Sequence, residues 1–228
     1  FAIPWFDRLM LGTTDHEVSD PRPCLNHNEV SEILSVCAGG FRKPPTLADV
    51  CATFSGIRPL ARQSAPSGAV SRISREHHIV ATPSGLLSVV GGKWTTYRLI
   101  AEQCVDQVLE ILNHAPRECR TRDLKLTAPL TPSAASPLVH PELPISEAMI
   151  RNAANSLFAV HVTDILTTRT RAAFVNAYAS EGALETITAI AANELGKNGA
   201  WQRRENERAR ALLKNFMPNP TPTRDKSD

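Results

Sequence analysis

Two places in the sequence combine positive charge with a local pattern that suits an anionic ligand. At the first, Arg58 ends a predicted strand over residues 50–58, because Pro59 cannot donate a strand hydrogen bond. An arginine fork binds phosphate well, since it makes two parallel hydrogen bonds. At the second, Gly91 and Gly92 carry no Cβ, and Lys93 adds a positive charge beside them. An ordinary surface arginine and a ligand-free turn are the alternative interpretations.

The second place lies between a predicted strand and a predicted helix, which together position Gly91, Gly92 and Lys93. Residues 86–90 form a short apolar run that predicts a buried strand, and residues 83–85 predict a hairpin turn from an earlier strand over 73–82. Thr95 or Thr96 is placed to cap a helix that follows the glycine pair. The start of a helix favours an anion, because its first N–H groups have no intrahelical partner. The apolar positions with helical spacing are Tyr97, Ile100, Ala101, Cys104, Val105, Val108, Leu109 and Leu112.

Three stretches of the sequence resemble segments of one enzyme family. Residues 3–5 and 11–15 read IPW and LGTTD, residues 55–60 read SGIRPL, and residues 91–98 read GGKWTTYR. In this order they are similar to the C-terminal portion of FAD-dependent, aerobic, quinone-linked glycerol-3-phosphate dehydrogenases. A weaker similarity, to the C-terminal helical domain of that family, covers the stretch DILTTRTRAAF at residues 164–174.

The resemblance implies a reaction and a set of binding residues. Enzymes of the family oxidise sn-glycerol 3-phosphate to dihydroxyacetone phosphate, pass a hydride from C2 to N5 of FAD, and then pass the electrons to quinone. The resemblance assigns no catalytic base within this chain and no metal ligand. By resemblance, the substrate is bound by Arg58, Arg75 and Lys93, and the cofactor by Gly91, Gly92, Lys93, Trp94 and Thr95.

The resemblance also implies an α/β plus all-α fold. The first part would be the C-terminal portion of a FAD-binding and substrate-binding domain of the glutathione-reductase-like type, over residues 1–114. A linker over 115–144 follows, because this stretch holds six prolines and many Ser and Thr residues. We expect a C-terminal helical domain over 145–217 and a disordered tail over 218–228.

Four helices are predicted in the second half of the chain. Ser146 is placed to cap the first, which runs to Phe158, and Thr163 the second, which runs to Tyr178. The third covers 183–195 and the fourth 201–216, whose charged residues, Glu205 and Glu207 among them, form a solvated outer face. By resemblance, ion pairs of Asp164, Arg169 and Arg171 lock the first helices together.

One motif of the family is missing. Its members begin with a strand, a GxGxxG turn and a helix that hold the FAD pyrophosphate, and no GxGxxG occurs in this sequence. We therefore expect the chain to be the C-terminal part of a longer enzyme, and to bind the cofactor only weakly by itself.

Composition narrows the classes of partner. The net charge of +2 is too small to indicate nucleic acid, and no apolar run reaches the roughly 18 residues of a membrane span. Five cysteines without a CxxC pair indicate reduced thiols, and hence a cytoplasmic protein.

His77 and His78 are adjacent on a predicted strand, so they face opposite sides and cannot bind one metal ion together. Arg117, Arg120, Arg122 and Lys125 form a solvated basic stretch, with contact to anionic lipid as the alternative.

The expected partners are therefore glycerol 3-phosphate and a quinone, with peripheral contact at the inner face of the cytoplasmic membrane. A homodimer is left open. The alternatives are a glycerol-3-phosphate oxidase that uses oxygen, an amino-acid or hydroxy-acid oxidase of the same superfamily, and a non-catalytic fragment that acts as a binding or assembly module.

Overall fold

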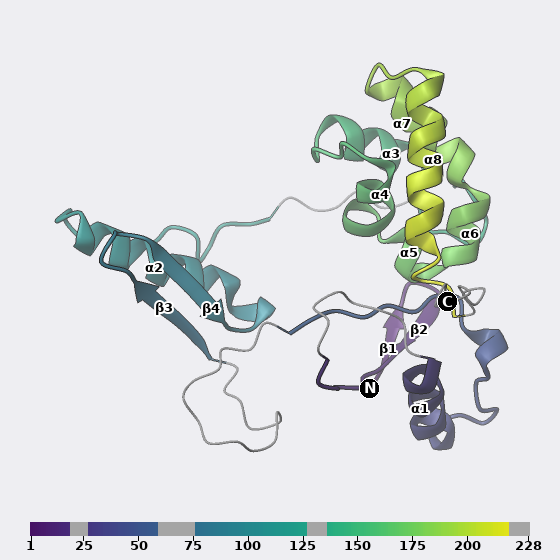
Figure 1. Ribbon diagram of the computed structural model, residues 1–228, viewed down its shortest axis with the longest axis horizontal. Coiled ribbons are helices and arrows are strands. Elements are labelled where there is room, and N and C mark those ends of the chain that lie inside the picture. Colours follow the sequence, from purple (N-terminus) through teal and green to yellow (C-terminus); the bar gives the residue numbers. More distant parts are fainter. Residues whose placement is uncertain (19–26, 59–75, 127–135, 219–228) are drawn as a thin grey trace, which may run out of the picture. The chain divides into compact units, whose positions relative to one another are not determined.

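The computed structural model describes residues 1–18, 27–58, 76–126 and 136–218 (Figure 1). These residues fall into two compact units. One unit combines Phe1–Gly56 with Pro129–Asp228, and the other is Ile57–Ala128. Each unit is described separately below. The sequence-based domain limits, including the linker over 115–144, stay predictions.

The unit Ile57–Ala128 is built from a hairpin and a helix. Strands β3 (His77–Ala81) and β4 (Leu87–Gly91) pair antiparallel, with His77 opposite Gly91. The turn closes through a hydrogen bond from the Thr82 amide to the Leu86 carbonyl at 2.9 Å. A short 3-10 turn, η4 (Trp94–Thr96), leads into helix α2 (Tyr97–Ile111). The predicted hairpin and the predicted helix are both confirmed, but the strand expected to be buried is not, because Leu86, Val89 and Val90 are 62%, 45% and 40% exposed.

Two expectations about helix α2 are wrong. Thr96 occupies the N-cap position, but its hydroxyl donates to the Lys93 carbonyl at 2.9 Å instead of accepting a hydrogen bond from the helix. The apolar side of the helix is also not buried. Tyr97, Val105 and Leu112 are each at least half exposed, at 50%, 57% and 58%. No described residue of this unit is fully buried.

The other unit begins with a second hairpin. Strands β1 (Ala2–Trp5) and β2 (Arg8–Leu11) pair antiparallel. Helix α1 (His27–Cys37) follows, continued by the 3-10 turns η1 (Ala38–Gly40) and η2 (Leu47–Asp49). The sheets of the described residues are two-stranded and antiparallel, so a larger α/β domain stays a proposal.

The helical domain, residues 136–218, contains the hydrophobic core of the described residues. Its main helices are α3 (Glu147–Asn155), α7 (Leu184–Glu194) and α8 (Gly199–Leu213). Shorter elements lie between them in the chain: α4 (Val162–Asp164), the π-helical turn η5 (Ile165–Arg169), α5 (Ala172–Val175) and α6 (Ala177–Gly182). Fully buried core residues include Leu143, Ile145, Ile150, Val162, Ile165, Leu166, Leu184, Ile187 and Leu213.

The first two of the four predicted helices are shorter than expected. Helix α3 ends at Asn155, and Phe158 is 87% exposed in a left-handed conformation (φ 56°). The second predicted helix is broken at Arg171, which is also left-handed (φ 63°). The predicted caps act differently as well. Ser146 occupies the N-cap position of α3 as predicted, but its side chain makes no capping hydrogen bond, and the Ser136 hydroxyl instead accepts from the Ala148 amide at 3.1 Å. Thr163 lies inside α4.

Three residues expected to form ion pairs act through other contacts. Asp164 accepts from the backbone amides of Val160 and His161, both at 2.9 Å. The guanidinium of Arg169 donates to the Leu157 carbonyl at 2.5 Å, and that of Arg171 lies 5.6 Å from the centre of the Phe174 ring. Within the described part of the chain, they therefore hold turns and loops of the domain rather than pairing with opposite charges.

The prediction that Glu205 lies on a solvated outer face is also wrong, because Glu205 is only 4% exposed. Its carboxylate accepts from the Val162 amide at 2.9 Å and contacts His161 Nδ1 at 3.0 Å. These contacts satisfy the first N–H of α4 and compensate the burial of a charge. Glu205 thus links α8 to the start of α4.

The strand predicted over residues 50–58 is not formed. Residues 50–54, here called the strap, are irregular, and their backbone groups bond to the helical domain. The Thr53 amide donates to the Phe216 carbonyl at 2.8 Å, and the Cys51 carbonyl accepts from the Ala177 amide at 3.0 Å. The alternating apolar pattern of this segment therefore reflects packing on helix ends rather than sheet pairing.

Candidate functional site

The glycine pair before helix α2 is required by the fold itself. Gly91 and Gly92 have φ angles of 78° and 92°, which side chains rarely adopt. A Cβ on Gly91 would lie 2.6 Å from the carbonyl oxygen of Glu76, and one on Gly92 would lie 2.9 Å from Ile100 Cδ1. The space left by the missing Cβ atoms is thus occupied by the Glu76 carbonyl, just before strand β3, and by the Ile100 side chain of helix α2. These contacts shape the turn that carries Lys93.

Gly91→Ala is expected to disrupt the β3–β4 hairpin. It combines a left-handed backbone, worth about 1–2 kcal/mol for an L-residue, with a clash against a backbone carbonyl. Gly85→Ala is the matched control, because Gly85 has a φ of 84° but nothing within 4 Å of its added Cβ. The rate of hydrogen exchange at the backbone amides of the β3–β4 hairpin should increase much more in Gly91→Ala than in Gly85→Ala. Equal exchange in the two variants would contradict this account.

Lys93, Trp94 and Thr95 form an exposed turn at the start of the helical segment. Trp94 is 86% exposed, and its ring lies 5.8 Å from that of Tyr97. Within the described part of the chain, Lys93 is also exposed and makes no side-chain ion pair. Trp94 and Thr95 come first in the helical segment, so their backbone N–H groups have no intrahelical partner. The turn therefore offers one cation and two amides to a negatively charged group.

Arg98, the last residue of the GGKWTTYR stretch, has a structural role. It donates to Glu102 at 2.6 Å and contacts the Thr121 hydroxyl at 3.4 Å and the Cys119 sulfur at 3.8 Å. The hydrogen bond to Glu102 is the main cause of the raised pKa of Arg98. Arg98 thus braces the segment after α2 against the helix.

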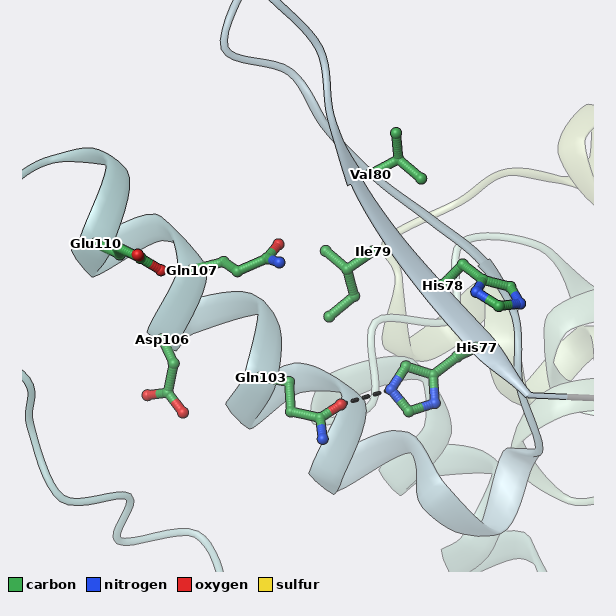
Figure 2. A pocket seen from close by; sticks show the side chains of 8 residues that line it. All are labelled: His77, His78, Ile79, Val80, Gln103, Asp106, Gln107 and Glu110. Atoms are coloured by element: carbon green, nitrogen blue, oxygen red, sulfur yellow. Dashed lines mark hydrogen bonds between the residues drawn. The ribbon is translucent and has the colours of Figure 1, made fainter.

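An open groove of about 540 Å³ lies between strand β3 and helix α2 (Figure 2). His77 Nε2 is 2.5 Å from Gln103 Oε1 across the groove, and Gln107 projects toward Ile79. Gln107 Oε1 is buried and has no hydrogen-bond partner among the described residues. The part of α2 that lines the groove is therefore polar. The groove is lined by His77, His78, Ile79, Val80, Gln103, Asp106, Gln107 and Glu110.

Sequence reasoning missed this polar side of the helix. Gln103, Gln107 and Glu110 recur at helical spacing, which was the available signal. Figure 2 shows His77 directed toward the helix, while His78 follows on the other side of the strand, as expected for neighbouring strand residues.

Of the two other residues predicted to bind the substrate, only Arg58 lies within the described part of the chain. Arg58 lies in irregular chain just after the strap, and its side chain is exposed. Arg75 lies outside the described residues. Their predicted contacts with a phosphate stay predictions.

Within the described residues, no group of three or more His, Cys, Asp or Glu side chains could hold a metal ion. In the same residues, no helix has both the length and the apolar character needed to cross a membrane.

Comparison with known proteins relates the chain to glycerophosphate-oxidising enzymes. Residues 105–204 match a family described as the C-terminal domain of alpha-glycerophosphate oxidase. The chain is 30% identical over 266 residues to the mitochondrial glycerol-3-phosphate dehydrogenase of Mesocricetus auratus, covering 93% of this chain and 36% of the relative. A probable mitochondrial glycerol-3-phosphate dehydrogenase of Caenorhabditis elegans is 29% identical over 264 residues, with coverage of 93% and 36%.

A third relative, the mitochondrial glycerol-3-phosphate dehydrogenase of Saccharomyces cerevisiae, is 33% identical over 136 residues, covering 55% of this chain and 21% of the relative. The chain spans only about a third of the length of the first two relatives, 36% in each case.

Proposed function

We propose that this chain acts as the C-terminal portion of a FAD-dependent glycerol-3-phosphate dehydrogenase, because residues 105–204 match a family described as the C-terminal domain of alpha-glycerophosphate oxidase. The observation that carries the proposal is the similarity over 93% of the chain to dehydrogenases of this name. The GGKWTTYR and SGIRPL stretches add the residues through which the chain would act.

The exposed turn after Gly92 fits the electron-rich edge of a flavin. It places the Lys93 ammonium next to two backbone N–H groups that have no intrahelical partner. Bound FAD would supply the hydride acceptor, so that glycerol 3-phosphate loses a hydride from C2 and the hydroxyl proton, giving dihydroxyacetone phosphate. Lys93 and the helix start would stabilise the negative charge that develops near N1 and the C2 carbonyl of the flavin ring.

Arg58 and Arg75 would bind and orient the substrate phosphate. Each guanidinium can donate two hydrogen bonds to phosphate oxygens, and the pair balances the phosphate charge. No described residue of this chain is assigned as the base that accepts the C2 hydroxyl proton. We propose that this group is supplied by the part of the enzyme that carries the GxGxxG turn.

The exposed apolar surface of the unit Ile57–Ala128 supports its being part of a larger domain. The apolar side chains of its described residues lie on β3, β4, α2 and the following segment without forming a core, and large apolar patches usually mark an interface. We propose that a glutathione-reductase-like FAD domain covers this surface. The exposed apolar residues include Val80, Leu86, Val89, Tyr97, Val105, Val108, Leu112 and Leu124.

Quinone is the proposed electron acceptor, and oxygen is the alternative. The name of the matched domain family refers to an oxidase, whereas the relatives are named as dehydrogenases. We further propose peripheral contact with a membrane, where the quinone is dissolved. Oxygen consumption compared with reduction of a soluble quinone analogue, in the same preparation, separates the two acceptors.

Lys93→Ala tests the proposed flavin contact. A hydrogen bond to a charged group is worth about 1.5–3 kcal/mol, so loss of Lys93 should slow flavin reduction by glycerol 3-phosphate roughly tenfold or more. The rate is measured in a single turnover without oxygen, in the full-length polypeptide. Lys125→Ala, which also removes an exposed lysine, is the control. An unchanged rate for Lys93→Ala would remove this residue from the site.

A further inference from the structure

The outward side of helix α8 is positively charged. Exposed residues of this helix and its C-cap recur three or four positions apart, at 203, 204, 207, 208, 211 and 214, so they form one side of the helix. Glu207 is the acidic residue among them. The other charged residues of this side, here called the basic face, are Arg203, Arg204, Arg208 and Lys214.

Most of this charge is not neutralised by the helical domain. Arg208 lies 3.6 Å from the buried Glu205 carboxylate, and Arg210, which is off the basic face, lies 3.5 Å from Glu185. Within the described residues, no carboxylate pairs with Arg203, Arg204 or Lys214. The basic face therefore has charge available for an anionic partner.

An exposed apolar loop lies at residues 157–160, just before helix α4. Phe158 is 87% exposed, Val160 60% and Leu157 42%, whereas Ala159 between them is buried. A phenylalanine ring this exposed gains nothing from the domain's own core. The apolar loop is thus a protruding apolar surface on a domain that otherwise buries its large side chains well.

The backbone of the apolar loop is fixed on both sides. The Arg169 guanidinium donates to the Leu157 carbonyl at 2.5 Å, and the Asp164 carboxylate accepts from the Val160 amide at 2.9 Å. Phe158 has a φ of 56°, which is rare for a bulky residue. The fold therefore holds the ring of Phe158 in an outward position, and its exposure does not result from a loose chain.

The apolar loop adjoins the basic face. His161 follows the loop directly, and its Nδ1 lies 2.6 Å from the Arg208 guanidinium. The Val162 amide donates to the Glu205 carboxylate at 2.9 Å, which joins α4 to α8 beside it (Figure 1). Positive charge and protruding apolar side chains are thus next to each other on one domain.

We propose that the basic face and the apolar loop together bind the surface of an anionic lipid bilayer. The cations are attracted by negatively charged headgroups, and the apolar side chains enter the boundary between headgroups and acyl chains, so each part strengthens the binding of the other. A nucleic acid would also meet the cations, but it offers Leu157 and Val160 no apolar surface to enter. The proposal rests on the proposed function, in which electrons pass to a quinone dissolved in a membrane, and it assigns that contact to the helical domain.

The test is binding of the full-length polypeptide to sedimented vesicles. Vesicles of equal parts phosphatidylcholine and phosphatidylglycerol should bind the protein, and vesicles of phosphatidylcholine alone should bind it much more weakly. Raising the salt from about 0.1 M to about 1 M shortens the Debye length from about 10 Å to about 3 Å, and should release the protein.

Two variants remove the two parts of the surface separately. Arg203→Gln/Arg204→Gln should weaken binding to the anionic vesicles about 30-fold, because each cation near such a surface contributes about fivefold, or about 1 kcal/mol. Phe158→Asn should weaken it roughly tenfold, through loss of the buried ring. Asparagine tolerates the left-handed backbone at this position, so the loop keeps its shape. Circular dichroism should be unchanged in both variants.

The matched control is Arg120→Gln/Arg122→Gln, which removes the same charge from exposed arginines in the basic stretch after α2. Its vesicle binding should equal that of the original protein. Equal binding to both kinds of vesicle, unchanged binding in Arg203→Gln/Arg204→Gln, or weakening in the control variant alone would overturn the proposal.

Reduction of the flavin by glycerol 3-phosphate, measured in solution without vesicles, separates the proposal from the function on which it rests. The rate should be the same in the original protein and in the Arg203→Gln/Arg204→Gln variant. A flavin that is reduced in a protein that binds no vesicles overturns the lipid-binding surface and leaves the dehydrogenase function intact. A flavin that stays oxidised in a protein that binds anionic vesicles overturns the function and leaves the binding surface.

Discussion

Leu166→Ala is expected to lower the free energy of unfolding of the helical domain by about 2–5 kcal/mol. Leu166 is fully buried in the core between the short helices of the domain. Truncation to alanine loses the transfer free energy of the removed carbons, and it leaves a cavity that the close-packed helices can fill only in part. This loss is large compared with the total stability of about 5–15 kcal/mol that is typical of a domain.

Urea unfolding of the chain, followed by helical circular dichroism, measures this change. Leu124→Ala is the control, because it makes the same substitution at a side chain that is 66% exposed. Its effect should stay within about 0.5 kcal/mol. Equal stability of the two variants would show that the helical domain does not have the core described above.

Arg58→Ala is expected to raise KM for glycerol 3-phosphate about tenfold or more in the full-length enzyme. An arginine contact with a phosphate is worth about 1.5–3 kcal/mol, and each 1.4 kcal/mol corresponds to a factor of ten. Bound flavin should be unaffected, because the proposed flavin contacts lie in the turn after Gly92.

Steady-state kinetics with glycerol 3-phosphate measure this effect, together with the flavin content of each preparation. Arg122→Ala is the control, since Arg122 is an exposed arginine away from the proposed site residues in the sequence. An Arg58 variant with the original KM would place the phosphate elsewhere.

Locally encoded elements of the fold could be predicted from the sequence. The β3–β4 hairpin follows from two apolar runs around the turn at residues 83–85, and helix α2 follows from its apolar spacing. Helix α7 ends next to Gly196, whose left-handed φ of 61° is the usual signal of a helix C-terminus.

Features that depend on distant contacts could not be predicted. The second predicted helix breaks at Arg171, after the Thr170 amide has bonded to the Ile165 carbonyl at 3.0 Å in a wider turn. Helix α5 follows the break, and helix α6 begins where the Ala177 amide donates to the Cys51 carbonyl of the strap. Glu205 is buried because the start of α4 supplies partners for its carboxylate. Helical spacing contains none of this information.

The place of the candidate site in the fold could be predicted from the sequence, but the residues that surround the site could not. The sequence placed Gly91, Gly92 and Lys93 in a turn between a strand and a helix, as the structure has them. It did not reveal that the glycines make room for Glu76 and Ile100. Nor did it show that the apolar side of α2 is exposed, because periodicity gives the side of a helix but not what covers it.

The most direct test of the proposed function is anaerobic addition of glycerol 3-phosphate to the purified full-length polypeptide while its flavin absorbance is recorded. We expect bound FAD, loss of its visible absorbance on addition of the substrate, and recovery of the absorbance when a quinone analogue is added. A preparation without flavin, or a flavin that stays oxidised in the presence of glycerol 3-phosphate, would contradict the proposal that this chain belongs to a working glycerol-3-phosphate dehydrogenase.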